Sequence, residues 1–158
     1  MHLMRGHLIV ALMILAGAAS QAQQLLAPMV PWGATRNEVK TTLDWHVVTE
    51  GKYYMVLQAP SGDYRVLYEF PLPARALVRM TYRFKTSPDF ATRDYADLRL
   101  KLCTVYGDPV DEDLQRDTQT AYWKQSDTYV QLFLYKGEDN EASLNIIYTS
   151  AKFLAPKK

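Results

Sequence analysis

Residues 76–85 read Ala-Leu-Val-Arg-Met-Thr-Tyr-Arg-Phe-Lys and form the clearest strand pattern of the chain. From Ala76 to Phe84 every second side chain is apolar, while arginine and threonine occupy most of the positions between them. An alternation with a period of two is typical of a β-strand with one buried face and one open face. Residues 64–70 show the same alternation. We therefore expect two such strands in succession.

Strand patterns continue on both sides of these two segments. Most of them are separated by short stretches of glycine, serine, aspartate or asparagine, which favour hairpin turns. Runs of strands joined by such turns predict an antiparallel sheet of about six to seven strands. The further strand segments are residues 45–49, 53–59, 119–125, 128–135 and 142–149.

Two helices are predicted, each ahead of a group of strands. Residues 36–43 follow Thr35 and contain Glu38, a pair with the spacing of a capping box. Residues 89–106 carry one apolar stripe at spacings of three and four, and Gly107 then favours a helix end. Because the helices are separate from the runs of strands, we expect an α+β domain with both helices packed on one face of the sheet. The order also leaves open a helix-then-meander unit that occurs twice, although no residue-level repeat supports it.

Three segments are expected to lack regular structure. Residues 23–31 predict an extended lead-in, because prolines interrupt any helix there. Residues 108–118 are rich in acids and predict a solvated loop. Residues 152–158 predict a frayed tail.

Residues 1–22 have the pattern of an export signal. Arg5 precedes a short apolar run, and the small residues Ser20 and Ala22 form a cleavage site. The run is shorter than the roughly 20 residues of a membrane-spanning helix, so an uncleaved anchor is the less favoured alternative. No cysteine follows the cut for lipid attachment. We expect a bacterial periplasmic or secreted protein whose single α+β domain spans residues 23–158, with no membrane span after cleavage.

The charge balance excludes some classes of partner. The chain has 18 lysines and arginines against 17 aspartates and glutamates, and the two numbers become equal without Arg5. A neutral protein has no global field that would attract nucleic acid or an anionic membrane, and export also argues against an RNA partner. Tyrosine is frequent, with 11 residues, which suits half-buried strands and interfaces.

No set of residues converges on a catalytic or metal site. After residue 22 the chain has one histidine, His46, and its single cysteine is Cys103, too few nitrogen and sulfur ligands for zinc or copper. It contains no Gly-x-Ser-x-Gly elbow and no phosphate-binding glycine loop. We therefore expect no cofactor and no metal, and we lean against an enzyme. A small hydrolase that uses His46 or carboxylates remains an alternative, and Cys103 is either a buried or a reactive thiol.

A binding surface has better support from the sequence. Strand faces opposite the predicted core carry aromatic and arginine side chains, as interaction patches do. Tyr53 and Met55 are expected at outward positions of one strand. The alternative for strand 128–135 is a place in the core, because it is apolar on both faces. The candidate binding residues are Arg79, Arg83, Tyr53, Tyr129, Phe133 and Tyr135. We expect another protein of the cell envelope as the partner, and a small-ligand carrier is a further alternative.

Short motifs resemble those of small secreted bacterial domains. Residues 32–39, Trp-Gly-Ala-Thr-x-x-Glu-Val, resemble a Trp-Gly-x-Ser/Thr turn that starts a helix, and residues 106–109 resemble a Tyr-Gly-x-Pro helix end. A late strand with a tryptophan, here Trp123, is similar too. The helix-then-meander plan is similar to the beta-lactamase-inhibitor-protein and SmpA/OmlA type of domain, which implies a binding or assembly module. The chain differs from these groups because it lacks a disulfide pair and a lipid-attachment cysteine, and no functional residue carries over.

Overall fold

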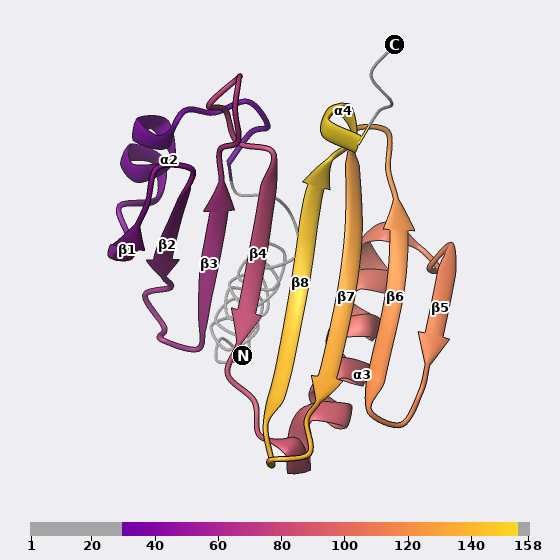
Figure 1. The fold of residues 1–158 in the computed structure, drawn as a ribbon. Coiled ribbons are helices and arrows are strands. Elements are labelled where there is room, and N and C mark those ends of the chain that lie inside the picture. The colour runs from indigo at the N-terminus through magenta and orange to yellow at the C-terminus, as the bar shows by residue number, and fades with distance from the viewer. Residues whose placement is uncertain (1–29, 155–158) are drawn as a thin grey trace, which may run out of the picture.

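A computed structural model describes residues 30–154, which form one antiparallel sheet and three helices (Figure 1). The strands are β1 (His46–Glu50), β2 (Tyr54–Gln58), β3 (Tyr64–Glu69), β4 (Arg79–Phe84), β5 (Asp111–Leu114), β6 (Thr118–Lys124), β7 (Thr128–Lys136) and β8 (Ala142–Ser150). The helices are α2 (Arg36–Leu43), α3 (Pro88–Tyr106) and α4 (Ala151–Leu154). The predicted export signal and most of the predicted lead-in lie outside the described residues.

The order of elements is the same in both halves of the described chain. Helix α2 precedes the meander β1–β4, and helix α3 precedes the meander β5–β8. The last strands of the two meanders, β4 and β8, pair antiparallel from Arg79↔Thr149 to Phe84↔Leu144. The strand order is therefore β1-β2-β3-β4-β8-β7-β6-β5, with β1 and β5 at the two edges. The predicted α+β antiparallel class is confirmed, and the helix-then-meander order occurs twice.

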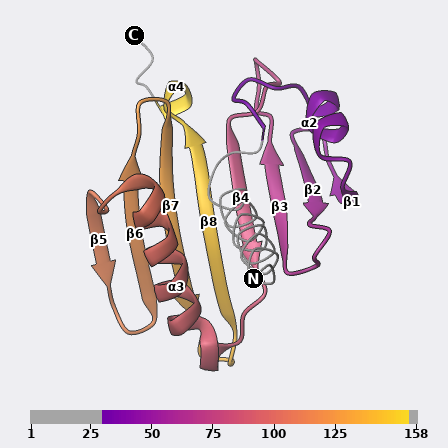
Figure 2. The ribbon, with the colours of Figure 1, turned by 180° about the vertical axis from the view of Figure 1, so that it is seen from behind.

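The core lies on one face of the sheet. Figure 2 shows α3 in front of β6, β7 and β8, and this helix buries Ala91, Tyr95 and Leu102. Val39 of α2 is fully buried and belongs to the same cluster. In the described part of the chain, no helix covers the opposite face of the sheet, apart from the short α4 at one end. The buried strand residues include Met55, Leu57, Val66, Tyr68, Met80, Tyr82, Ala121, Trp123, Val130, Leu132, Leu134, Leu144, Ile146 and Tyr148.

Helix α2 begins with the predicted capping box. The backbone nitrogen of Glu38 donates to Thr35 Oγ1 at 3.3 Å, and the backbone nitrogen of Thr35 donates to Glu38 Oε2 at 2.7 Å. These bonds satisfy two of the amides that a helix start leaves unpaired. The bond from the Thr35 backbone also lowers the pKa of Glu38, because it favours the charged carboxylate.

We expect Thr35→Ala to lower the free energy of unfolding by about 1 kcal/mol, because the hydroxyl that accepts from the backbone amide of Glu38 is lost. Urea denaturation followed by circular dichroism measures the change. Thr41→Ala is the matched control on the same helix: the Thr41 hydroxyl donates only to carbonyls of the helix itself, those of Asn37 and Glu38. Equal losses in the two variants would contradict a specific role of the cap.

The expected loop at residues 108–118 is wrong, since it contains strand β5, and the predicted number of strands was therefore too low. Strand β5 forms because it pairs with β6 from Asp111↔Tyr122 to Leu114↔Gln119. On its helix side, Glu112 accepts two hydrogen bonds from Arg99 of α3, one of them from Nη2 to Oε2 at 3.0 Å. This ion pair offsets the charge of one acid of the segment. The tail also differs from the prediction, because residues 151–154 form α4.

Candidate binding face

The face of the sheet opposite the core, which we call the open face, carries three rows of side chains that cross the strands. Side chains alternate between the two faces of a strand, so the neighbours of each buried strand residue point to the open face. The first row is Tyr54, Glu69, Arg79, Thr149, Tyr129 and Lys124. The second row is Val56, Leu67, Thr81, Ile147, Gln131 and Tyr122. The third row is Gln58, Arg65, Arg83, Asn145, Phe133 and Thr120.

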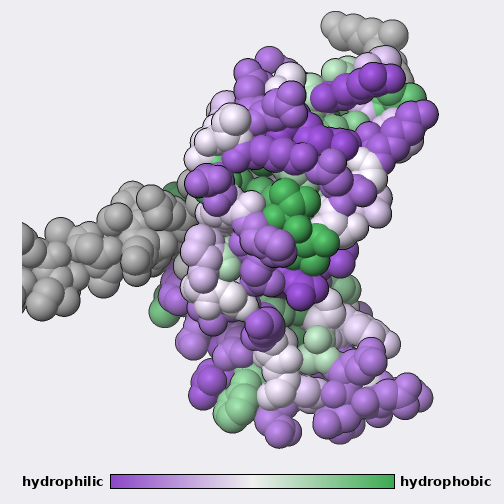
Figure 3. Space-filling model, turned by 90° about the vertical axis from the view of Figure 1, so that its left-hand side faces the viewer, coloured by the Kyte–Doolittle hydropathy of each residue, from purple (hydrophilic) through white to green (hydrophobic). Residues whose placement is uncertain are grey.

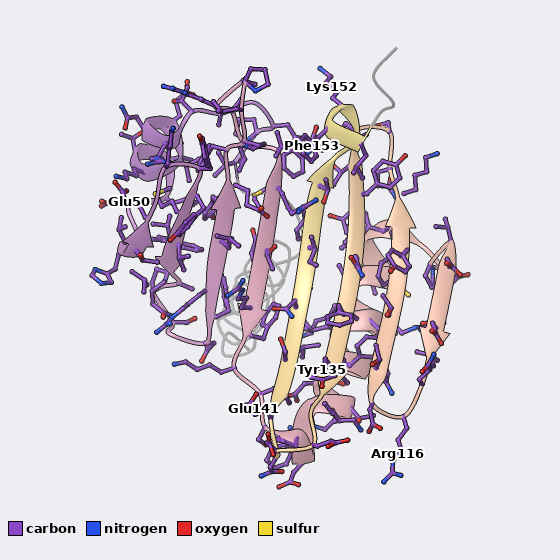
Figure 4. All side chains as sticks on the ribbon, viewed as in Figure 1. Glu50, Arg116, Tyr135, Glu141, Lys152 and Phe153 are labelled. Atoms are coloured by element: carbon purple, nitrogen blue, oxygen red, sulfur yellow. The ribbon has the colours of Figure 1, made fainter. Side chains whose placement is uncertain are left out.

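The open face is hollowed. A depression of about 1040 Å³ extends over β3, β4, β8, β7 and β6, and the apolar side chains of Leu67, Ile147 and Phe133 line it together with polar neighbours. Figure 3 shows the molecule from the β1 edge. The open face is on the right of this view, and its outline curves inward between the top and the bottom of the molecule. Figure 4 looks directly onto the side chains of this face.

Four of the six predicted binding residues lie together in the depression. Arg79 and Arg83 on β4 and Tyr129 and Phe133 on β7 all line it. Tyr135 lies on the same face, farther along β7 in register with Ser143, and its exposed fraction is 48%. Figure 4 shows Tyr135 near the end of β7 that leads into the turn to β8.

The core alternative for strand β7 is wrong. Val130, Leu132 and Leu134 are the residues that face α3, and each is at most 1% exposed. Tyr129 and Phe133 are only half-buried and point to the open face. Strand β7 is therefore apolar on both faces because one face packs in the core and the other lines the depression.

Tyr53 is not on the open face. It precedes β2, in the turn after β1, where its backbone oxygen accepts a hydrogen bond from Phe70 at 2.7 Å and its ring lies 5.1 Å from the ammonium of Lys52. Met55, expected beside it at the surface, is fully buried in the core. The prediction was wrong because β2 is apolar at consecutive positions, so its alternation did not show which face was buried.

The arginines of the open face differ in their surroundings. Arg79 forms an ion pair with Glu69, with Nη1 and Oε2 3.7 Å apart, and its Nε donates to Thr149 Oγ1 at 3.4 Å. Arg65 and Arg83 lie directly opposite each other on neighbouring strands. Within the described part of the chain, neither of these two forms an ion pair with a carboxylate.

Sequence reasoning missed several residues that line the depression. Each of them stands next to a buried residue in its strand, as Arg79 and Arg83 do. Period-two spacing could therefore have placed them on the open face, once Trp123 was assigned to the core. The missed lining residues include Leu67, Tyr122, Lys124, Asn145 and Ile147.

The residues considered for catalysis are not brought together. His46 starts the edge strand β1, whereas Cys103 packs half-buried on α3, which covers the other end of the sheet (Figure 2). In residues 30–154, no group of three or more histidine, cysteine, aspartate or glutamate side chains could hold a metal ion. No helix within this range has the length and apolar character to cross a membrane.

The fold and the open face define a class of protein: an α+β domain whose eight-stranded antiparallel sheet leaves one hollowed face uncovered by helices in the described chain, apart from the short α4 at one end. Comparison with protein-family models, with curated proteins and with solved structures gives no match for this chain. The resemblance to beta-lactamase-inhibitor-protein and SmpA/OmlA domains stays a prediction.

Proposed function

We propose that this protein is an exported binding module, an inhibitor, immunity-type or envelope accessory protein, whose open face receives another protein. The observation that carries the proposal is the hollowed open face, where Arg79, Arg83, Tyr129 and Phe133 lie together. Aromatic and arginine side chains contribute most of the binding energy in protein interfaces. The four residues stand in the first and third rows, on either side of Ile147 in the second row, so that the patch combines an apolar centre with polar side chains at its margin, as a typical interface does.

The size of the depression supports a protein partner. It extends over five strands, and four inter-strand spacings of about 4.8 Å make it about 19 Å wide. A shallow surface of this width suits a segment of a folded protein, whereas small ligands are held in clefts that enclose most of their surface. This favours protein binding over the small-ligand carrier.

The test is capture of the partner with matched variants. Tagged protein comprising residues 23–158 is crosslinked in the envelope fraction of its host, and captured proteins are identified by mass spectrometry. We expect one stoichiometric partner. The amount of this partner captured by the double variant Tyr129→Ser/Phe133→Ser should be lower by a factor of about ten or more, because two interface anchors are removed.

The control for this capture removes apolar side chains elsewhere on the surface. Phe90 and Leu100 on α3 are 52% and 65% exposed and lie on the helix side of the sheet. Phe90→Ser/Leu100→Ser is expected to capture the partner as the unchanged protein does. Loss of the partner in this control alone would place the interface on α3, and the absence of any stoichiometric partner would refute a protein-binding function.

A further inference from the structure

Two arginines of the open face stand side by side without a counter-ion. Arg65 on β3 and Arg83 on β4 are direct cross-strand partners, and both side chains are exposed. Like charges directly opposite each other in a sheet are destabilising. In the described chain their row has no carboxylate from Gln58 on β2 to Thr120 on β6. The sheet therefore keeps a pair of positive charges that nothing in this row neutralises.

The hydrogen bonds around the pair leave most of its donors unused. Arg65 donates through Nε to Gln58 Oε1 at 2.9 Å, and Gln58 is itself held by a bond from Nε2 to the backbone oxygen of Tyr64 at 2.8 Å. Gln58 thus orients Arg65, whose two terminal nitrogens donate to no described residue. The guanidinium of Arg83 likewise donates to none of them. Unpaired guanidinium groups bind carboxylate and phosphate oxygens, often through two parallel hydrogen bonds.

We infer that Arg65 and Arg83 together bind a carboxylate of the partner protein, an aspartate or glutamate beside an apolar residue. This inference rests on the proposed function, because it assigns the arginine pair to the same open face. The apolar half of the motif fits the neighbouring side chains: Leu67 follows Arg65 by two positions on the same face of β3, and Phe133 lies in the same row as Arg83, beyond Asn145. The carboxylate binds the arginines while the apolar side chain covers the floor of the depression.

The charges elsewhere on the face favour a single carboxylate over a polyanion. Besides the cations Arg79, Arg83 and Lys124, the acids Glu69 and Asp111 line the depression, and Glu69 pairs with Arg79. A membrane surface or a nucleic acid that covered the whole face would bring its phosphates against these acids. One carboxylate at the arginine pair meets only positive charge.

The test uses two defined peptides and NMR spectroscopy of the protein. The probe is the acetylated, amidated peptide Glu-Leu-Glu-Phe-Glu, and its control is Gln-Leu-Gln-Phe-Gln. We expect the acidic peptide, at millimolar concentration, to shift the Nε–Hε resonances of Arg65 and Arg83 saturably. The neutral peptide should bind about tenfold more weakly, because its amide oxygens accept hydrogen bonds without the charge that strengthens those of a carboxylate. Arg65→Gln and Arg83→Gln should each weaken the acidic peptide about tenfold, whereas Arg93→Gln, on the helix side, should not.

Several results would overturn this inference. They are no shift of either resonance with the acidic peptide, equal binding of the two peptides, and stronger shifts from inorganic phosphate or from phosphatidylglycerol vesicles. The capture experiment separates this failure from failure of the proposed function. A partner that depends on Tyr129 and Phe133, but is held equally well after Arg65→Gln/Arg83→Gln, would keep the binding module and remove only the carboxylate subsite.

Discussion

Trp123→Ala is expected to lower the free energy of unfolding by about 3–5 kcal/mol. Trp123 is 1% exposed and heads the largest fully buried side chains of the described chain, on the face of β6 that meets α3. Its indole Nε1 donates to the backbone oxygen of Gly107 at 2.8 Å. Gly107 ends α3 with a φ of 78°, a conformation that favours glycine, so the indole ties the end of the helix to the sheet. Truncation would leave both a cavity and an unpaired carbonyl.

Two variants separate these contributions in urea denaturation. Trp123→Phe refills most of the cavity but leaves the Gly107 oxygen without its donor, so a loss of about 1–3 kcal/mol is expected. Tyr122→Ala, at the next position on the open face, removes a side chain that is 38% exposed and should cost less than about 1 kcal/mol. If Tyr122→Ala cost as much as Trp123→Ala, the assignment of the two faces of β6 would be wrong.

The elements that the sequence predicted well are those decided by local pattern. The alternation in residues 76–85 predicts β4, and the capping box of Thr35 and Glu38 predicts the start of α2. Both depend on neighbours within a few residues, so one segment contains the whole signal. The repeated helix-then-meander order follows from such segments in sequence.

The elements that the sequence missed depend on distant partners. Strand β5 exists because of its pairing with β6 and the ion pair of Glu112 with Arg99, neither of which a local pattern shows. The indole of Trp32 donates to Thr128 Oγ1 at 2.8 Å, 96 residues away, and no local pattern shows this contact either. Contacts of this kind are set by the tertiary fold, and they override the propensities of the segments they join.

The candidate site could be predicted from the sequence only in part. Alternation along β4 was enough to place Arg79 and Arg83 together on one face. It could not choose a face for β7 or β2, because both strands are apolar at consecutive positions. For β7 the position of α3 determines which face is buried, because the helix covers the face that carries Leu132 and does not cover the face that carries Phe133.

The buried tyrosines predict a steep loss of stability above pH 10. Tyr68 and Tyr148 are fully buried, and burial raises the pKa of both phenols far above their usual range. Burial, and then the charge of Glu112, raises the pKa of Tyr95 to about 12. The protonated phenol is thus favoured in the folded protein, so its contribution is complete below the unfolded pKa of about 10. It is lost as the pH rises from that value through the folded pKa.

The size of the effect follows from the number of protons involved. Above pH 10 the unfolded chain releases phenol protons that the folded chain retains, which costs about 1.4 kcal/mol per pH unit for each tyrosine. For Tyr68 and Tyr148 alone, the free energy of unfolding should be about 3 kcal/mol lower at pH 11 than at pH 9. Urea denaturation at the two pH values measures the difference, and phenolate absorbance reports how many tyrosines ionise.

Tyr68→Phe tests the assignment to a particular residue. The Tyr68 hydroxyl is buried and has no hydrogen-bond partner in the described chain, so its removal should leave stability at neutral pH unchanged or slightly higher. The same variant should lose about 1.4 kcal/mol less than the unchanged protein between pH 9 and pH 11, because one titrating group is gone. Tyr53→Phe, in the exposed turn before β2, is the control and should show the full loss. A full loss in Tyr68→Phe as well would contradict the link between this buried phenol and alkaline unfolding.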